Sequence, residues 1–192
     1  MIQLRRRKRT RKVQCAYHGR ATAFFAMPSP VDPSRDRYLD ARISRVQGGR
    51  CVILLHTLPD GTSHFDWMLE TIGDESGEET ADQRSLICFR SPKRPDELEP
   101  REEIAVERLP DHRRRYLDFE GPISGDRGQV KRVAQGTIIR VKSSVHSMDV
   151  ELLLKWDAAP RFASHPCWLR LSPTQDAAEW NVLCIDSREV AT

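Results

Sequence analysis

The stretch Cys51-Val-Ile-Leu-Leu-His56-Thr-Leu-Pro-Asp-Gly-Thr-Ser-His64-Phe-Asp66-Trp-Met-Leu-Glu70 decides the fold class. It opens with a continuous apolar run of strand length and closes with residues 63–70, which alternate as a half-buried strand does. Between them, Pro59-Asp-Gly61 has the composition of a turn. The stretch therefore predicts two strands joined as a hairpin.

The sequence beyond this hairpin also has the pattern of β-strands. Short strands are predicted at Ser85–Phe89, Ile104–Val106, Gly136–Lys142, Asp149–Trp156, Pro166–Leu171 and Trp180–Ile185. A short helix is predicted over Ser34–Val46, where Ser34 is placed to cap it and Gly48-Gly49 ends it. About eight short strands with few helices are typical of a barrel or a sandwich.

Composition bounds the class of protein. The 192 residues are 39% hydrophobic and 31% charged, and no apolar run reaches the roughly 20 residues that cross a bilayer. No apolar segment follows the basic N-terminus, so we expect no secretory signal and a cytoplasmic protein; a mitochondrial presequence is the alternative. The five cysteines are scattered without a CxxC, which argues against disulfides and a cysteine zinc site, and Cys51 and Cys88 are expected in the core.

The net charge of +3 conceals an asymmetry. Residues 1–12 hold seven basic side chains, so the remainder carries −4 (3 − 7). We expect residues 1–33, which end in a proline-rich linker, to be a disordered basic tail, and residues 34–192 to be a single domain. The tail has three readings: it touches nucleic acid, it is a solvated tail, or the true start is Met27.

The hairpin also carries a candidate metal site. Alternation along the second strand puts His64, Asp66, Met68 and Glu70 on one face, and the hairpin brings His56 alongside His64. Two imidazoles and one carboxylate, with coordination positions left open, are typical of a catalytic Zn²⁺ or Mn²⁺ site. The alternative is that His56 ends a strand and His64 and Asp66 are a hydrogen-bonded polar pair.

Downstream motifs favour the metal site. His56 and His64-x-Asp66-x-x-Leu-Glu70 are followed by a four-residue step from His112 to Tyr116 and by Asp118-Phe-Glu-Gly121. In this order the three motifs resemble the 3′-phosphoesterase domain of bacterial DNA ligase D, and the resemblance covers residues 50 to about 140. Details around His112 look closer to stand-alone relatives of that domain.

The resemblance implies a mainly β fold: a small closed or nearly closed barrel of about eight strands with one or two short helices. It also implies a metal-dependent phosphoesterase that removes a 3′-phosphate or 3′-ribonucleotide from DNA ends. The implied cofactor is Mn²⁺, with Zn²⁺ or another divalent ion as substitutes, held by His56, His64 and Asp66. His112 and Tyr116 would contact the phosphate, and Glu70 would orient a ligand or a neighbouring arginine.

The partners implied are primer-template DNA 3′ ends and a separate DNA ligase or polymerase, with no membrane and a monomeric protein. The family has an arginine where this chain has Met68, so a phosphate clamp is missing there. Lys93, Arg113 and Arg127 are the candidate substitutes, although the run Arg113–Arg115 also fits a solvated surface. The alternative function is a catalytically weak module that binds nucleic-acid ends or repair partners.

Overall fold

The structure, a computed structural model, describes residues 42–73, 80–144, 149–158, 166–176 and 178–186. All of them belong to one compact unit, Asp32–Thr192. The predicted basic tail, residues 1–33, and the start of the predicted helix, residues 34–41, lie outside the described residues. Within the described part, no helix is long and apolar enough to span a membrane.

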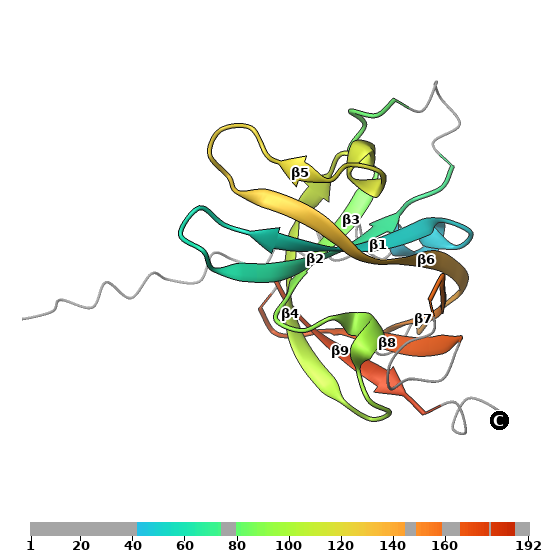
Figure 1. The fold of residues 1–192 in the computed structure, drawn as a ribbon. Helices are drawn as coiled ribbons and strands as arrows, with labels where there is room; N and C mark the ends of the chain where they lie inside the picture. The colour runs from blue at the N-terminus through green and yellow to red at the C-terminus, as the bar shows by residue number, and fades with distance from the viewer. Residues whose placement is uncertain (1–41, 74–79, 145–148, 159–165, 177, 187–192) are drawn as a thin grey trace, which may run out of the picture. The chain divides into compact units, whose positions relative to one another are not determined.

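Eight antiparallel strands close into a barrel, which confirms the predicted fold class (Figure 1). Their order around the barrel is β1-β2-β3-β4-β9-β8-β7-β6, and β6 pairs with β1 to complete the ring. The two-residue β5 pairs with β6 alone. The strands are β1 (Arg50–Thr57), β2 (Ser63–Glu70), β3 (Leu86–Ser91), β4 (Glu103–His112), β5 (Gly121–Pro122), β6 (Gln129–Ser143), β7 (Val150–Trp156), β8 (Cys167–Pro173) and β9 (Glu179–Ile185).

The helical elements of the described residues are short. Residues 42–43 are helical and run directly into the 3-10 turn η1 (Ser44–Val46), and the other two elements are the 3-10 turns η2 (Pro95–Glu97) and η3 (Arg114–Leu117). Single 3-10 turns commonly connect strands, because their hydrogen-bond geometry does not support longer runs. The end of the helix predicted from Ser34 still contributes to the core through the buried Val46.

Strand β4 is longer than the predicted Ile104–Val106 and continues through Pro110 to His112. It pairs with β9 only from Glu103 to Glu107, and beyond that point only with β3, across a register shift. A proline is tolerated there because it lacks the N–H that a second neighbouring strand would need. The extension carries His112 onto the sheet.

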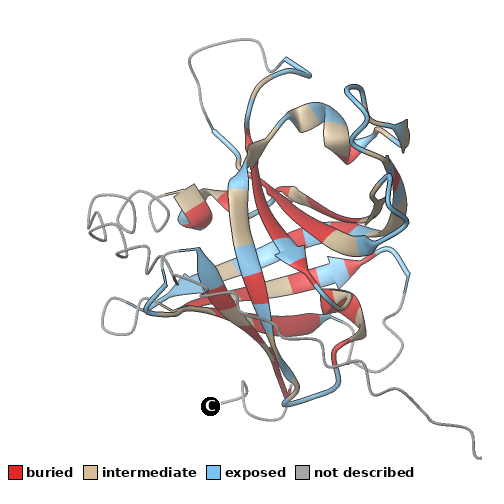
Figure 2. Cartoon of the chain, turned by 90° about the vertical axis from the view of Figure 1, so that its left-hand side faces the viewer, coloured by how far each residue is buried: buried red, intermediate tan, exposed pale blue. Residues whose placement is uncertain are grey.

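The barrel wall near β1, β2 and β3 is buried on both faces (Figure 2). Inward side chains, including Ile53, Trp67 and Leu69, join the main core. The outward face carries a second apolar cluster, in which Leu117 of η3 covers the wall and the following loop packs against it. Members of the outer cluster are Val52, Leu54, Met68, Leu86, Cys88, Leu117 and Val130. Burial on both faces explains the unbroken apolar run that opens the hairpin.

Strand β6 closes the ring because it serves two neighbours in turn. Its first half pairs with β1 and its second half with β7, and Gly136 lies opposite both Cys51 and Trp156. A Cβ at Gly136 would stand 2.4 Å from the carbonyl oxygen of Lys155. The absence of a side chain therefore allows the close approach at which the barrel closes.

Candidate metal centre

The β1–β2 hairpin sets the register of the candidate ligands. His56 lies directly opposite His64, and Leu54 lies opposite Asp66, so all three ligands share the outer face. The connecting turn is held by the Leu58 N–H, which donates to the Thr62 carbonyl over 2.8 Å, and by the Thr62 N–H, which donates to Asp60 over 2.9 Å. A short, internally bonded turn leaves the register little freedom.

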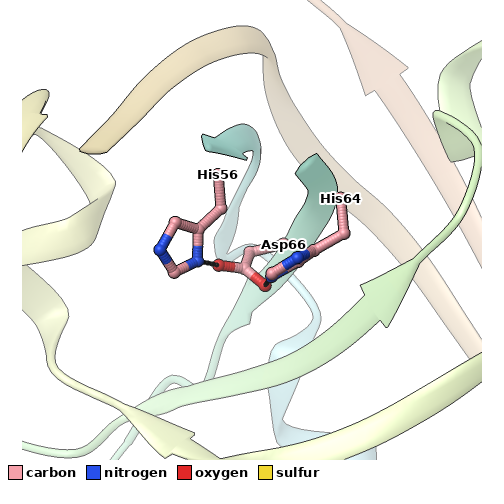
Figure 3. Close-up of side chains that lie close together, drawn as sticks. All are labelled: His56, His64 and Asp66. Carbon is pink, nitrogen blue, oxygen red and sulfur yellow. Dashed lines mark hydrogen bonds and ion pairs between the residues drawn. The ribbon is translucent and has the colours of Figure 1, made fainter. Parts of the chain in front are cut away.

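The Asp66 carboxylate lies between the two imidazole rings (Figure 3). Its Oδ2 is 3.2 Å from His56 Nδ1, and its Oδ1 is 3.3 Å from His64 Nε2. One donor atom from each residue falls within 4.8 Å of the others, a group that could hold a metal ion. The side chains are 15%, 13% and 5% exposed for His56, His64 and Asp66, so the group opens toward solvent from its histidine side.

The tautomer of His56 indicates that a cation fits between His56 and Asp66. His56 Nε2 is 2.7 Å from the carbonyl oxygen of Arg127, which can only accept, so Nε2 carries the hydrogen. In the neutral ring, Nδ1 then presents a lone pair to the Asp66 oxygen, which also carries lone pairs. Two acceptors at 3.2 Å need a proton or a metal ion between them. A backbone carbonyl behind a ligating histidine is the usual support of such sites.

The second oxygen of Asp66 strengthens this fit. Asp66 Oδ1 is buried, and apart from its 3.3 Å contact with His64 Nε2, which falls short of hydrogen-bond geometry, it has no hydrogen-bond partner among the described residues. Burial, together with the neighbouring Arg90 and His56, lowers the pKa of His64, which Asp66 opposes. Histidine ligates metals as the neutral ring, so the lowered pKa favours the form that binds. The donor set of two imidazoles and one carboxylate is therefore of a kind that could hold a divalent metal ion.

His112 and Tyr116 stand together on the same outer face. His112 lies opposite Leu86 at the end of β4, and its Nδ1–H donates to the Pro110 carbonyl over 2.8 Å. This bond leaves Nε2 as the ring atom available to a substrate. Burial lowers the pKa of His112, and the Asp66 carboxylate acts in the opposite direction, so the two groups lie within electrostatic reach. The rings of His112 and Tyr116 are 5.6 Å apart.

Glu70 shares the face of the ligands but contacts other groups. It is buried and lies 2.9 Å from the guanidinium of Arg114, and it accepts the backbone N–H of Arg50 over 3.0 Å. The structure thus brings it to an arginine, as expected, and shows no described contact with His56, His64 or Asp66. Its contacts connect η3 to the hairpin, and they indicate a structural rather than a catalytic role.

The candidate phosphate contacts differ in their surroundings. Lys93 is paired with both carboxylate oxygens of Glu102, at 2.7 and 2.8 Å. Arg113 lies 3.8 Å from Asp82 on the surface. The Arg127 side chain donates to the Ser124 carbonyl, so the contribution of Arg127 to the site is its main-chain oxygen.

Met68 does not border the metal site as a replaceable clamp. It shares the ligand face, as alternation predicts, but it is 1% exposed within the outer apolar cluster. This burial argues against a phosphate contact for an arginine at position 68. A guanidinium there would lie among apolar side chains without water.

Two contributors to the site escape sequence reasoning. The Arg127 carbonyl carries no side-chain signal, and only the glycines of residues 121–128 mark its loop. Arg90 lies opposite Asp66, but the long connection between β2 and β3 has no turn signature that fixes their register.

Comparison with known proteins leaves the chain without an assigned family. No family model matches it, and no curated protein matches it.

Proposed function

We propose that this protein is a metal-dependent phosphoesterase that acts on DNA 3′ ends, removing a 3′-phosphate or a 3′-ribonucleotide. The observation that carries the proposal is the His56–Asp66 contact, in which two acceptor atoms face each other with room for a proton or a metal ion between them. The likeness of the hairpin and the His112–Tyr116 step to the ligase D 3′-phosphoesterase domain gives the substrate class. No comparison adds to that likeness.

His56, His64 and Asp66 would hold the ion, which polarises a phosphoryl oxygen and lowers the pKa of water when bound. The oxygen of water attacks phosphorus, and the bond to the leaving oxygen breaks. For a 3′-phosphate, the products are inorganic phosphate and a 3′-hydroxyl. For a 3′-ribonucleotide, the P–O5′ bond breaks, and a nucleoside leaves a 3′-phosphate end.

His112 would act as the acid/base group of this reaction. Its Nδ1–H is committed to the Pro110 carbonyl, which fixes the ring, and Nε2 of the neutral ring would accept a proton from the attacking water and return it to the leaving oxygen. Acid/base groups of this kind contribute roughly 10²–10⁴-fold to rate. Tyr116 packs against His112 and against Phe119, so its ring position is set by the outer apolar layer.

The testing experiment uses two primer-templates, one ending in a 3′-phosphate and one in a single 3′-ribonucleotide, each with Mn²⁺ and with EDTA. Mn²⁺-dependent shortening or dephosphorylation that disappears in the His56→Ala/His64→Ala/Asp66→Ala variant supports the proposal. Binding of both ends without turnover supports the weak binding module instead. One observation favours that alternative. Where the resembled family has an arginine, this chain has Met68, which is buried in the outer apolar cluster, so the ligand face lacks that positive charge.

A further inference from the structure

A row of charged side chains leads away from the metal centre across four strands. Asp66 on β2 lies opposite Arg90 on β3, Arg90 lies opposite Glu107 on β4, and Glu107 lies opposite Glu179 on β9. Residues directly opposite in antiparallel strands point to the same face, with Cβ atoms roughly 5 Å apart. The row therefore continues the outer face that carries the ligands.

A pocket of about 600 Å³ lies along this row. Three members of the row line it, and its end at the metal centre is formed by the candidate ligand His64. The small side chains of Ser91, Pro92 and Ala105 are also part of its lining. The pocket and the metal centre are thus one continuous site through His64.

Arg90 has the chemistry to hold a phosphoryl group at this junction. Its side chain is 46% exposed, and its guanidinium forms an ion pair with Glu107 at 2.9 Å. That contact uses one nitrogen of a group with five N–H donors. Arg90 is also the one arginine or lysine among the described residues that line the pocket. An oxyanion near Asp66 and His64 would meet it first.

The rest of the pocket suits a neutral group rich in hydrogen-bond donors. Its volume lies in the range of roughly 300–1,000 Å³ typical of small-molecule sites, far more than a phosphate fills. Glu107, Asp176 and Glu179 line it, and their carboxylates accept hydrogen bonds from hydroxyl and amino groups. The same carboxylates disfavour additional negative charge.

We propose that Arg90 contacts the substrate phosphoryl group and that the pocket beyond it accepts the leaving nucleoside, so that the protein prefers a 3′-terminal nucleotide to a 3′-phosphate. This inference rests on the proposed function. In the preferred reaction, water adds to phosphorus, the P–O5′ bond breaks, and the nucleoside O5′ takes up a proton as it departs into the pocket. A 3′-phosphate end has no nucleoside to occupy the pocket, so the pocket does not contribute to the rate of its removal.

The test compares kcat/KM for the two primer-templates in Mn²⁺ across five proteins: the parent, three variants of the pocket and one control. The parent should process the ribonucleotide end faster. Ala105→Trp, a bulky change at an exposed position lining the pocket, should lower the ratio of ribonucleotide to phosphate removal on the order of tenfold. Arg90→Ala should lower both rates on the order of 100-fold with Mn²⁺ affinity retained, and Arg90→Lys should recover part of the loss.

Thr137→Trp is the matched control, since Thr137 is exposed on β6 and lines neither this pocket nor the metal centre. The inference is overturned if Ala105→Trp has the same ratio of ribonucleotide to phosphate removal as Thr137→Trp. It is also overturned if Arg90→Ala processes both primer-templates as fast as the parent. Affinities of the same DNAs, measured by fluorescence anisotropy in EDTA, separate the two proposals. If the parent turns over neither end, the proposed function fails. Tighter parent binding of the ribonucleotide end that Ala105→Trp abolishes would still support the subsite, and equal binding of both ends would refute it.

Discussion

Replacing Gly128 by alanine tests whether the Arg127 carbonyl governs the metal centre. Gly128 has φ +81° and lies against the end of β1, where an added Cβ would stand 1.9 Å from the Thr57 carbonyl oxygen. Real contacts of this kind are not shorter than 3.0 Å, so the loop must retreat from the strand by about 1.1 Å. Arg127 precedes Gly128 and His56 precedes Thr57, so the same retreat separates the carbonyl from the ring.

The magnitude follows from the 2.7 Å separation of His56 Nε2 and the Arg127 oxygen. A retreat of about 1.1 Å takes that separation to about 3.8 Å, beyond hydrogen-bond distance. Loss of the group that orients a ligating histidine costs roughly 10–100-fold in metal affinity. This loss corresponds to about 1.4–2.8 kcal/mol of binding free energy. Alanine at positive φ adds about 1–2 kcal/mol of backbone strain, which lowers the free energy of unfolding.

Gly125 supplies the matched control in the same loop. Its φ is +78°, but a Cβ there meets nothing within 4 Å, so Gly125→Ala brings the backbone strain without the clash. Isothermal titration with Mn²⁺ and urea denaturation should show both variants destabilised and only Gly128→Ala weakened in metal binding. Equal Mn²⁺ affinities in the two variants would refute the reasoning.

Three further outcomes are expected. Saturating Mn²⁺ should raise the Tm of the parent, with a stabilisation of about 2.7 kcal/mol at a Mn²⁺ concentration of 100 times Kd, and Asp66→Asn should abolish this rise. If calorimetric scans of Asp66→Asn still show the rise, the carboxylate is not a ligand. Met68→Arg should lower the free energy of unfolding, measured in urea, by about 3–5 kcal/mol, because it buries an unpaired charge. Met68→Leu should lower it by less than about 1.5 kcal/mol. Equal urea midpoints for the two variants would contradict this expectation. His112→Ala should lose most turnover on 3′-phosphate DNA with Mn²⁺ affinity unchanged, and a parental rate would remove His112 from the mechanism.

The hairpin could be predicted from sequence because its determinants are local. The run from Cys51 and the turn at Pro59–Gly61 fix both strands, and alternation then aligns His56, His64 and Asp66. Each step uses residues within a few positions of one another, where backbone preference and periodicity are decisive. The fold class and the cluster of ligands were accessible for this reason.

The features that sequence did not reveal depend on distant segments. Alternation placed Met68 on the correct face, but its burial is caused by Leu117, which η3 brings from elsewhere in the chain. A proline in the sequence usually predicts the end of a strand. Strand β4 nevertheless continues past Pro110, because β9 does not pair with it there. The register of Arg90 against Asp66 is set across the sheet, because the connection between β2 and β3 is too long to fix it.

The support of His56 also has a consequence for the order of folding. Asp66 is 10 positions from His56 in the chain, whereas Arg127 is 71 positions away and arrives only when β6 pairs with β1. Loop-closure entropy makes the first contact fast and the second slow. A chain with a formed hairpin and an open barrel therefore already carries all three ligands, but holds His56 in no fixed tautomer. If the proposed site binds Mn²⁺, tight binding should require closure of the ring, and added Mn²⁺ should favour the closed chain over the open one.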